Sequence, residues 1–416
     1  MKYINREIEE KINKLIGRKE IIGIRGPRQA GKTTLLKNIY EKINENKVYI
    51  DMYIDEYRKN FEENYMDFIK RYKDEKKLFL FLDEIQKLKD GGKILKIIYD
   101  NFNDIKIFIS GSSTLEINTK ILPDLVGRLI LFTLYPFNFY EFLLSKDKGL
   151  ANLVKEKRES LRGFLENDNE IKKPSFNEEI VKYLKEYLIY GGYPEIAIAK
   201  DFEEKKILLK NLYNLYIEKD IVNFFHIYDS SKFIDLTKYL SFIIGNILDI
   251  SLISKELKIS YRKVENYITI LKHTYIIDLI GPFHKNIVTE LKKAKKIYFI
   301  DLGLRNSVID NFLEYDKRTD KGQLLENFVY IELLKNFSDW KINYWRTTGK
   351  AEIDFILTKE NKVIPIEVKT SKRINKGFYT FIKRYKPDKG LIITLNEFDI
   401  KDIYNTRVYT IPAYYI

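Results

Sequence analysis

The stretch Gly26-Pro27-Arg28-Gln29-Ala30-Gly31-Lys32-Thr33-Thr34 decides the fold of the first part of this chain. It follows the apolar segment 21–24 and opens an amphipathic segment, which is the strand–loop–helix context of a phosphate-binding P-loop. Glycines let backbone N–H groups turn toward phosphate oxygens, and the helix N-terminus adds its positive end. In this pattern Lys32 reaches the β- and γ-phosphates and the Thr33 hydroxyl holds Mg²⁺. The sequence therefore predicts that residues 26–34 bind ATP.

The run Leu78-Phe79-Leu80-Phe81-Leu82-Asp83-Glu84 supplies the second half of such a site. An apolar run of this kind is typical of a central parallel strand that is covered on both faces. Acidic residues at its carboxyl end lie where open α/β sheets bind their ligands. We expect Asp83 to orient Mg²⁺ and Glu84 to polarise the attacking water, because a glutamate next to the aspartate favours hydrolysis over binding alone.

The first 145 residues alternate apolar strands with amphipathic helices, which predicts a parallel sheet with crossover helices. The predicted strands are 20–25, 47–51, 77–83, 106–110 and 128–134, and the predicted helices are 33–44, 62–72 and 92–102. The fold class is therefore a multidomain α/β protein whose first domain, 1–145, is a P-loop NTPase of the ASCE type.

Two further positions near this site each allow two interpretations. Ser112 follows the strand 106–110 and is either a sensor of the γ-phosphate or a cap of the strand end. Arg128 follows Gly127 and is either an arginine finger that acts on a neighbouring subunit of a homo-oligomer or an ordinary surface arginine.

Composition bounds the partners and the location. Lysine and arginine exceed the acidic residues to give a formal net charge of +13, which indicates a polyanionic partner such as nucleic acid. The alternative is a solvated, charge-rich surface of the thermophilic type, since 32% of the residues are charged. There is no cysteine, which excludes disulfides and thiolate sites. The first residues lack the apolar segment of a secretory signal and no apolar run is long enough to span a membrane, so we expect a cytoplasmic protein without a membrane partner.

The rest of the chain divides by pattern into a helical lid at 146–232, a winged-helix domain at 233–300 and a C-terminal domain at 301–416. Residues 249–257 and 260–271 read as two helices joined by a tight turn, and the segment around Gly281-Pro282 reads as a hairpin. Arg262, Lys263 and Asn266 fall on the polar face of the second helix. Such a domain contacts DNA or serves as a packing module between other domains.

The C-terminal domain contains an acidic constellation. Glu326 is placed on a helix, Asp354 on a strand, and Glu367 and Lys369 on one face of the next strand. This helix-Glu, strand-Asp, Glu-x-Lys order resembles the PD-(D/E)XK core of restriction endonucleases and archaeal junction resolvases. The resemblance implies that Glu326, Asp354 and Glu367 hold Mg²⁺ while Lys369 activates the attacking water. The alternative is that the alternating charges mark solvated strand faces.

The whole chain also resembles the AAA-type ATPases of archaea and bacteria that are related to the STAND group. The motifs that carry this resemblance are the P-loop, Leu-Asp-Glu-Ile-Gln at 82–86, Ser-Gly-Ser-Ser at 110–113, Val-Gly-Arg at 126–128 and the aromatic segment 135–142. The turn Gly191-Gly192-Tyr193-Pro194-Glu195 resembles the glycine–proline motif of that group, which implies that Pro194 contacts the adenine base. A simple helix-breaking turn is the alternative.

Two functions follow from these motifs. The first is an enzyme in which ATP hydrolysis controls a nucleic-acid-binding, Mg²⁺-dependent nuclease domain, with DNA the favoured partner. The second is an ATP-dependent switch that recruits DNA or a protein partner without cleaving anything.

Overall fold

The computed structural model describes residues 3–73, 77–111, 121–167, 169–222, 225, 227, 229–284, 294–370 and 375–416. Contacts within the chain define two units: unit 1 is Met1–Pro136 with His273–Tyr275, and unit 2 is Phe137–Lys272 with Ile276–Ile416. Each unit is described by itself. The finer division into domains at 1–145, 146–232, 233–300 and 301–416 stays a prediction.

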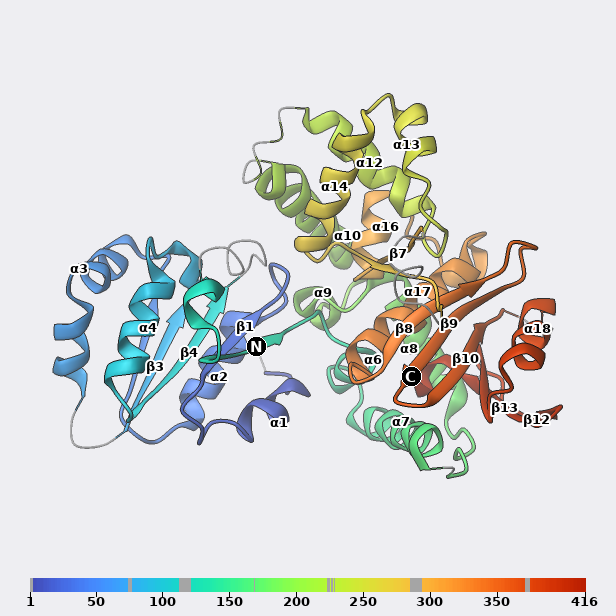
Figure 1. The fold of residues 1–416 in the computed structure, drawn as a ribbon, viewed down its shortest axis with the longest axis horizontal. Helices are drawn as coiled ribbons and strands as arrows, with labels where there is room; N and C mark the ends of the chain where they lie inside the picture. Colours follow the sequence, from blue (N-terminus) through green and yellow to red (C-terminus); the bar gives the residue numbers. More distant parts are fainter. Residues whose placement is uncertain are drawn as a thin grey trace. The chain divides into compact units, whose positions relative to one another are not determined.

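Unit 1 is built on a five-stranded parallel sheet with the order β2-β3-β4-β1-β5 (Figure 1). The strands are β1 (Ile21–Arg25), β2 (Lys47–Asp51), β3 (Leu78–Asp83), β4 (Ile105–Gly111) and β5 (Leu129–Thr133). Strands β3 and β4 are buried along their whole length. Because both of their faces are covered, their sequences are apolar without alternation. The predicted α/β sheet is confirmed, since each observed strand begins and ends within one residue of its predicted bounds.

Helices cover both faces of this sheet. On one face α1 (Ile8–Asn13) and α2 (Lys32–Lys42) pack on β1, β3 and β4 through Ile12, Leu35 and Leu36. On the other face α3 (Asp55–Tyr72) and α4 (Gly91–Asn101) pack through Phe61 and Ile98. Helix α3 begins at Asp55 rather than at the predicted residue 62, and its two parts meet at a non-helical Asn64. Short 3₁₀ turns follow at Ile85–Lys87 and Leu122–Leu125.

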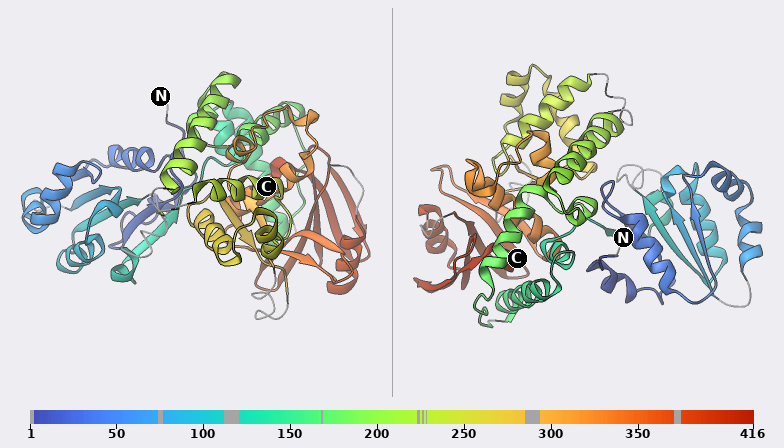
Figure 2. Two further views of the ribbon diagram at one scale, coloured as in Figure 1. Left: turned by 90° about the horizontal axis from the view of Figure 1, so that it is seen from above. Right: turned by 180° about the vertical axis from the view of Figure 1, so that it is seen from behind.

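Unit 2 contains most of the helices and two sheets (Figures 1 and 2). Its helices are α6 (Phe139–Leu144), α7 (Lys148–Asn167), α8 (Asn177–Tyr190), α9 (Pro194–Ile198), α10 (Phe202–Leu212), the π-helical stretch Tyr213–Ile221, α12 (Ser230–Phe242), α13 (Ile250–Leu257), α14 (Tyr261–His273), α16 (Leu302–Val308), α17 (Lys321–Asn336) and α18 (Lys376–Tyr385), with 3₁₀ turns at Tyr315–Lys317 and Ala413–Tyr415.

The larger sheet of unit 2 has the order β12-β13-β11-β10-β9-β8 and is coloured orange to red in Figure 2. Its strands are β8 (Lys341–Arg346), β9 (Glu352–Lys359), β10 (Lys362–Val368), β11 (Lys389–Thr394), β12 (Asp399–Ile403) and β13 (Thr406–Pro412). Strands β8, β9 and β10 are antiparallel, whereas β10, β11 and β13 are parallel. Helix α18 connects β10 to β11 and packs on the sheet through Phe378 and Phe381. Helix α17 stacks Tyr330 on Phe355 of β9.

A two-stranded antiparallel sheet of β6 (Ile277–Ile280) and β7 (Lys296–Phe299) precedes α16. Tyr298 of β7 stacks on Tyr330 of α17 at 4.4 Å between ring centroids, which fixes this small sheet against α17.

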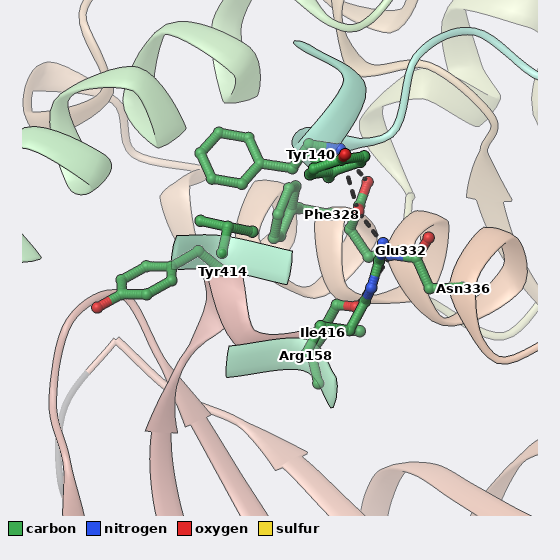
Figure 3. A pocket seen from close by; sticks show the side chains of 9 residues that line it. Tyr140, Arg158, Phe328, Glu332, Asn336, Tyr414 and Ile416 are labelled. Carbon is green, nitrogen blue, oxygen red and sulfur yellow. Dashed lines mark hydrogen bonds between the residues drawn. The ribbon is translucent and has the colours of Figure 1, made fainter. Parts of the chain in front are cut away.

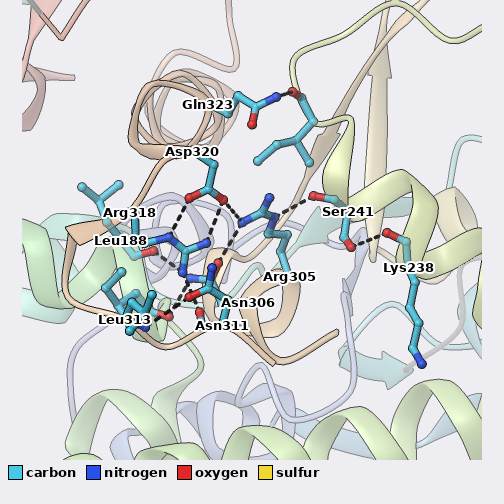
Figure 4. A network of polar contacts seen from close by, with 12 residues as sticks. Leu188, Lys238, Ser241, Arg305, Asn306, Asn311, Leu313, Arg318, Asp320 and Gln323 are labelled. Atoms are coloured by element: carbon cyan, nitrogen blue, oxygen red, sulfur yellow. Dashed lines mark hydrogen bonds and ion pairs between the residues drawn. The ribbon is translucent and has the colours of Figure 1, made fainter. Parts of the chain in front are cut away.

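Buried charges connect α16 to the start of α17 (Figure 4). The Asp320 carboxylate lies between two arginines, at 2.6 Å from Arg305 and 2.7 Å from Arg318. Both arginine side chains are at most 1% exposed. Within the described part of the chain, no helix combines the length and the apolarity needed to cross a membrane.

Candidate functional site

The P-loop lies between β1 and α2, and its backbone explains its glycines. A Cβ atom on Gly26 would lie 2.0 Å from the backbone oxygen of Leu134, so no larger residue fits there. Gly31 precedes α2 with a φ of 93°, in the left-handed region that favours glycine. Pro27 and Ala30 are buried, whereas Arg28 and Gln29 are exposed at the loop tip. The predicted loop therefore has the turn that exposes the N-terminus of α2 to a phosphate.

Lys32 is buried at the start of α2 beside the acidic end of β3. Its ammonium donates hydrogen bonds to the backbone oxygens of Gly26, at 3.1 Å, and of Pro27, at 2.7 Å. Burial lowers the pKa of Lys32 to about 8, while the carboxylates of Glu84 and Asp83 act in the opposite direction. The structure therefore brings the predicted Lys32, Asp83 and Glu84 to one place.

Asp83 is held by side chains from the strands on both sides of β3. The Tyr49 hydroxyl of β2 donates to Asp83 Oδ2 at 2.7 Å, and the Ser110 hydroxyl of β4 donates to Oδ1. Asp83 itself is 1% exposed. Both hydrogen bonds fix the carboxylate orientation, and neither Tyr49 nor Ser110 was among the predicted site residues. Ser110 carried a signal, since it ends a buried strand with a small hydroxyl.

Glu84 has an unusual backbone for a residue that is not glycine. Its φ is 56° and its ψ is 47°, in the left-handed region. The Gln86 side chain donates a hydrogen bond to Glu84 Oε2, and the Glu84 N–H donates to Ser110 Oγ at 3.2 Å. Strained backbone of this kind is concentrated at functional sites. A carboxylate held at the end of β3 is suited to polarise a water molecule.

Arg6 contacts the P-loop from the N-terminal segment, although the sequence did not predict this. Its guanidinium donates to the backbone oxygen of Ala30 at 2.9 Å and to that of Tyr135 at 2.6 Å. Arg6 is 6% exposed, so these bonds tie the loop to the segment after β5. A contact between residues 24 positions apart leaves no periodic signal in the sequence.

Oxygen ligands of the kind that Mg²⁺ prefers are present in this site. The Thr33 hydroxyl stands at the first turn of α2 and the Asp83 carboxylate at the end of β3, so these two residues would hold the ion. When bound, Mg²⁺ neutralises charge on the phosphates. The prediction that Lys32 and the helix N-terminus bind phosphate oxygens, that Asp83 orients Mg²⁺ and that Glu84 polarises the attacking water agrees with this arrangement and stays a prediction.

The remaining predictions for the nucleotide site keep their status. Ser112 lies outside the described residues. Arg128 forms a two-pronged ion pair with Asp100, at 2.8 and 3.0 Å, on the surface of unit 1. Pro194 is the first residue of α9 in unit 2. The roles of Ser112 as a sensor, of Arg128 as a finger and of Pro194 as a base contact stay predictions.

The glycine–proline turn has a clear structural role within unit 2. The Gly192 N–H donates to Asp301 Oδ2 at 2.7 Å, and the Phe137 N–H donates to the Gly192 backbone oxygen at 2.7 Å. A Cβ atom would lie 2.2 Å from Asp301 Oδ1 at Gly191 and 2.2 Å from the Phe137 backbone oxygen at Gly192. Both glycines therefore allow close approach of neighbouring segments.

The predicted acidic constellation of unit 2 comes together at the ends of β9 and β10. Asp354 Oδ2 accepts a hydrogen bond from the Val368 N–H at 2.8 Å. Glu367 Oε1 accepts from Asn375 and lies 2.6 Å from the Lys369 ammonium. Glu367 is 1% exposed, so it does not mark a solvated strand face. Burial and the neighbouring Asp354 raise the pKa of Glu367 to about 8, against the effect of Lys369.

Glu326 joins this group from α17, together with a lysine that the sequence did not single out. Lys296 of β7 places its ammonium 2.6 Å from Glu352, 3.3 Å from Glu326 and 3.7 Å from Asp354. The Tyr298 hydroxyl donates to Glu326 Oε1 at 2.7 Å. Burial raises the pKa of Glu326 to about 7, although Lys296 lowers it. Burial opposes the charge on Lys296, but the surrounding carboxylates raise its pKa above the usual value.

We call Glu326, Glu352, Asp354 and Glu367 the acidic cluster. Carboxylates are ligands of Mg²⁺, and Glu367 Oε2 is buried without a hydrogen-bond partner. However, each of these carboxylates already forms an ion pair with the ammonium group of Lys296 or Lys369. Among the described residues, no group of three or more His, Asp or Glu side chains is arranged to hold a metal ion. This arrangement does not fit a divalent ion, and the metal role predicted for Glu326, Asp354 and Glu367 stays a prediction.

A narrow pocket of unit 2 lies elsewhere, between α6, α7 and α17 (Figure 3). Figure 3 shows Glu332 beneath the start of α6, where its carboxylate accepts the Phe139 N–H at 3.1 and 3.2 Å. Glu332 thereby satisfies a free N–H group of a helix start. Phe328 and Tyr414 line the pocket as well. None of the predicted site residues lines it.

The parallel sheet, the P-loop and the acidic strand define unit 1 as a P-loop ATPase domain. A family model described as an AAA domain matches residues 18–143, which confirms the predicted AAA-type ATPase with ATP as its nucleotide. Two models described as domains of unknown function match residues 181–315 and 321–414.

Several relatives share most of the chain. The uncharacterized protein MJ1544 of Methanocaldococcus jannaschii is 30% identical over 375 residues, which cover 87% of this chain and 76% of the relative. The uncharacterized protein MJ1637 of the same organism is 28% identical over 405 residues, 93% of this chain and 83% of the relative. An uncharacterized protein of Haemophilus influenzae is 24% identical over 361 residues, 83% of this chain and 81% of the relative. The chain belongs to the family of MJ1544.

Proposed function

We propose that this protein is an ATP-hydrolysing AAA-type protein whose nucleotide state controls nucleic-acid binding by unit 2. One observation carries the proposal: the polar face of α14 is exposed and presents Arg262 and Asn266 near its N-terminal end, within an arrangement of three helices followed by two antiparallel strands. Helices α12, α13 and α14 precede β6 and β7, which is the element order of a winged helix.

The two faces of α14 differ in the way that a DNA-reading helix requires. Its apolar residues Val264, Tyr267 and Leu271 are buried. Arg262 and Asn266, near its N-terminal end, are exposed. In helix-turn-helix proteins the first turns of the second helix contact base edges and the adjacent phosphates. The net charge of +13 agrees with a polyanionic partner.

A second candidate function is metal-dependent cleavage of a phosphodiester by the acidic cluster. The order α17, β8, β9, β10, α18, β11 and the positions of Asp354, Glu367 and Lys369 agree with the resemblance to PD-(D/E)XK nucleases. The buried, unpaired Glu367 Oε2 favours this candidate. The Lys296 ammonium among the carboxylates stands against it and favours a switch that binds without cleaving.

The binding proposal is tested with fluorescently labelled single-stranded, double-stranded and branched DNA. Fluorescence anisotropy is measured for the wild type without nucleotide, with ADP and with a slowly hydrolysed ATP analogue. We expect the affinity for DNA to differ at least about 10-fold between nucleotide states. A smaller ratio of affinities would correspond to only a weak coupling free energy between ATP binding and DNA binding. Lys32→Ala is expected to remove this difference, and Arg262→Ala to weaken binding in every state. If the affinity for DNA is the same in all three nucleotide states, the proposed control by ATP is wrong.

Cleavage is tested on the same DNA with Mg²⁺ or Mn²⁺, followed by denaturing electrophoresis. Asp354→Asn and Glu367→Gln are the active-site variants, and Lys59→Ala, on the exposed surface of α3, is the matched control. If the wild type leaves every substrate intact, the second candidate is wrong and the binding switch remains.

A further inference from the structure

We propose that Lys296 is the resident cation of the acidic cluster and takes the place that a divalent metal ion would occupy. This inference goes beyond the proposed nucleic-acid binding, because it holds whether or not unit 2 binds nucleic acid, and it argues against the second candidate, metal-dependent cleavage by the acidic cluster. Its direct consequence is that the wild-type cluster does not bind Mg²⁺ or Mn²⁺.

Lys296 is placed as a metal ion would be, between carboxylates from two different elements. Its ammonium lies within 3.7 Å of oxygens from Glu326 of α17 and from Glu352 and Asp354 of β9. Its side chain is 2% exposed, so solvent does not screen these pairs. The ammonium is within hydrogen-bond distance of Glu352 and Glu326, and Asp354 adds an ion pair at longer range.

The backbone of Lys296 is fixed on both sides, so its position does not depend on the side chain alone. Lys296 pairs with Ile280 of β6 and also forms a bridge with Ile247. The Ile297 N–H donates to the Asn246 backbone oxygen at 3.2 Å, and the Leu248 N–H donates to that of Lys295 at 2.8 Å. A strand that is held along both edges presents Lys296 to the cluster as a preorganised group.

Two carboxylates of the cluster have partners in addition to Lys296. Glu326 Oε1 accepts the Tyr298 hydroxyl as well as the Lys296 ammonium. Glu352 also lies 3.6 Å from the Arg346 guanidinium. An ammonium and a divalent ion that share the same carboxylates repel each other strongly, since little solvent separates them. Lys296 and a metal ion therefore exclude one another.

The decisive experiment measures Mn²⁺ binding to the nucleotide-free full chain by electron paramagnetic resonance. The proteins are the wild type, Lys296→Met and, as matched control, Lys295→Met, which changes the exposed neighbour on the same segment. Weak Mn²⁺ binding at other sites, for example at Asp83, is the same in all three proteins and does not affect the comparison between them. We expect Lys296→Met to gain one site per chain that tightens Mn²⁺ binding at least about 10-fold, and the control to match the wild type. The added Asp354→Asn exchange in Lys296→Met is expected to remove the gained site.

Removal of Lys296 leaves buried carboxylates without a partner, so the variant can lose stability. Thermal unfolding followed by circular dichroism covers this case. Mn²⁺ at 100 times its dissociation constant is expected to raise the Tm of Lys296→Met by several degrees and to leave that of the wild type unchanged. Lys296→Arg keeps the charge and is expected to bind no additional Mn²⁺.

The wild type alone provides the result that would overturn the proposal. If the wild type binds Mn²⁺ at a site that Asp354→Asn or Glu367→Gln abolishes, a metal ion and Lys296 coexist and the inference is wrong. If Lys296→Met is folded and gains no site, the inference is wrong as well. Neither result depends on DNA binding, which is measured separately by anisotropy.

Discussion

At the scale of single residues, Asp83 shows how the sheet prepares a functional carboxylate. Strand β3 lies between β2 and β4, and each neighbour contributes one hydroxyl, from Tyr49 and Ser110, to one oxygen of Asp83. Burial together with the negative charge of Asp83 raises the pKa of Tyr49, so the hydroxyl stays a donor over the whole working range of pH. Groups that orient a ligand in this way usually affect its function almost as much as the ligand itself.

Tyr49→Phe tests this role. It removes one hydrogen bond to a carboxylate, which contributes about 1.5–3 kcal/mol when the acceptor is charged. We expect steady-state ATP turnover to fall about 10-fold or more, since 1.36 kcal/mol corresponds to tenfold in rate. Affinity for ATP without Mg²⁺ is expected to stay within twofold. Tyr53→Phe, at a position that is 61% exposed, is the control and should behave as the wild type.

A second prediction concerns Gln86, which donates to Glu84 Oε2. If this bond holds the carboxylate toward the attacking water, Gln86→Leu lowers kcat by about 10-fold to 100-fold and leaves KM for ATP nearly unchanged. Glu84→Gln measured in parallel should abolish turnover while nucleotide binding persists. A Gln86→Leu enzyme with normal kcat would show that Glu84 needs no such support.

In the nucleotide site, the predicted residues that the structure brings together are those whose sequence signal is contiguous. Lys32, Asp83 and Glu84 lie in runs that combine a strand with a loop, so local pattern finds them. Tyr49 and Lys296 gain their roles from contacts with residues 34 and 30 positions away, to Asp83 and Glu326. Nothing in the sequence around them distinguishes them from the many other tyrosines and lysines. Only the pairing of strands shows what they touch.

At the scale of elements, the same limit separates the predicted from the unpredicted segments. The strands of unit 1 were found because they are apolar runs bounded by turns. Strand β12 has no apolar run that would mark it in the sequence, because its residues are mostly exposed and polar, as is typical of a strand at a sheet edge. Helix α16 has no amphipathic period that would mark it, because all seven of its residues are buried. Its Arg305 and Asn306 are polar but satisfied inside the protein.

Asp320 connects α16 to α17 and carries a stability prediction. It neutralises Arg305 and Arg318, so Asp320→Asn leaves two buried guanidinium groups without their carboxylate. Breaking a buried pair in this way destabilises a protein by about 3–5 kcal/mol. Urea unfolding at pH 7 measures the loss, and Asp235→Asn, at an exposed position of α12, is the comparison. A loss below about 1 kcal/mol would show that the arginines find other partners.

The same carboxylate predicts a dependence on pH. Burial opposes ionisation of Asp320, but Arg318 and Arg305 lower its pKa from 3.8 to about 2. Because the folded value lies below the unfolded one, the stabilisation is complete above pH 4 and is lost as the pH falls toward 2. The difference in unfolding free energy between the wild type and Asp320→Asn should therefore shrink between pH 4 and pH 2. A difference that stays constant over this range would contradict the pairing.

At the scale of the whole molecule, the net charge of +13 predicts how any nucleic-acid complex responds to salt. Each phosphate that a lysine or arginine neutralises releases counterions, so the logarithm of affinity falls linearly with the logarithm of salt concentration, with a slope of about −0.9 per contact. Six contacts lower the affinity about 10³-fold between 50 and 200 mM salt. If Arg262 contacts phosphate, Arg262→Ala reduces the salt slope by about 1 for every DNA sequence. If Arg262 instead contacts a base, the substitution weakens the binding by about 1–3 kcal/mol for one DNA sequence and leaves the binding of the others unchanged. Lys59→Ala removes an equal charge from unit 1 and should leave the slope unchanged. Anisotropy titrations at four salt concentrations decide between these outcomes. A wild-type salt slope near zero would mean that the excess of basic residues forms a solvated surface. Unit 2 would then bind a partner other than nucleic acid.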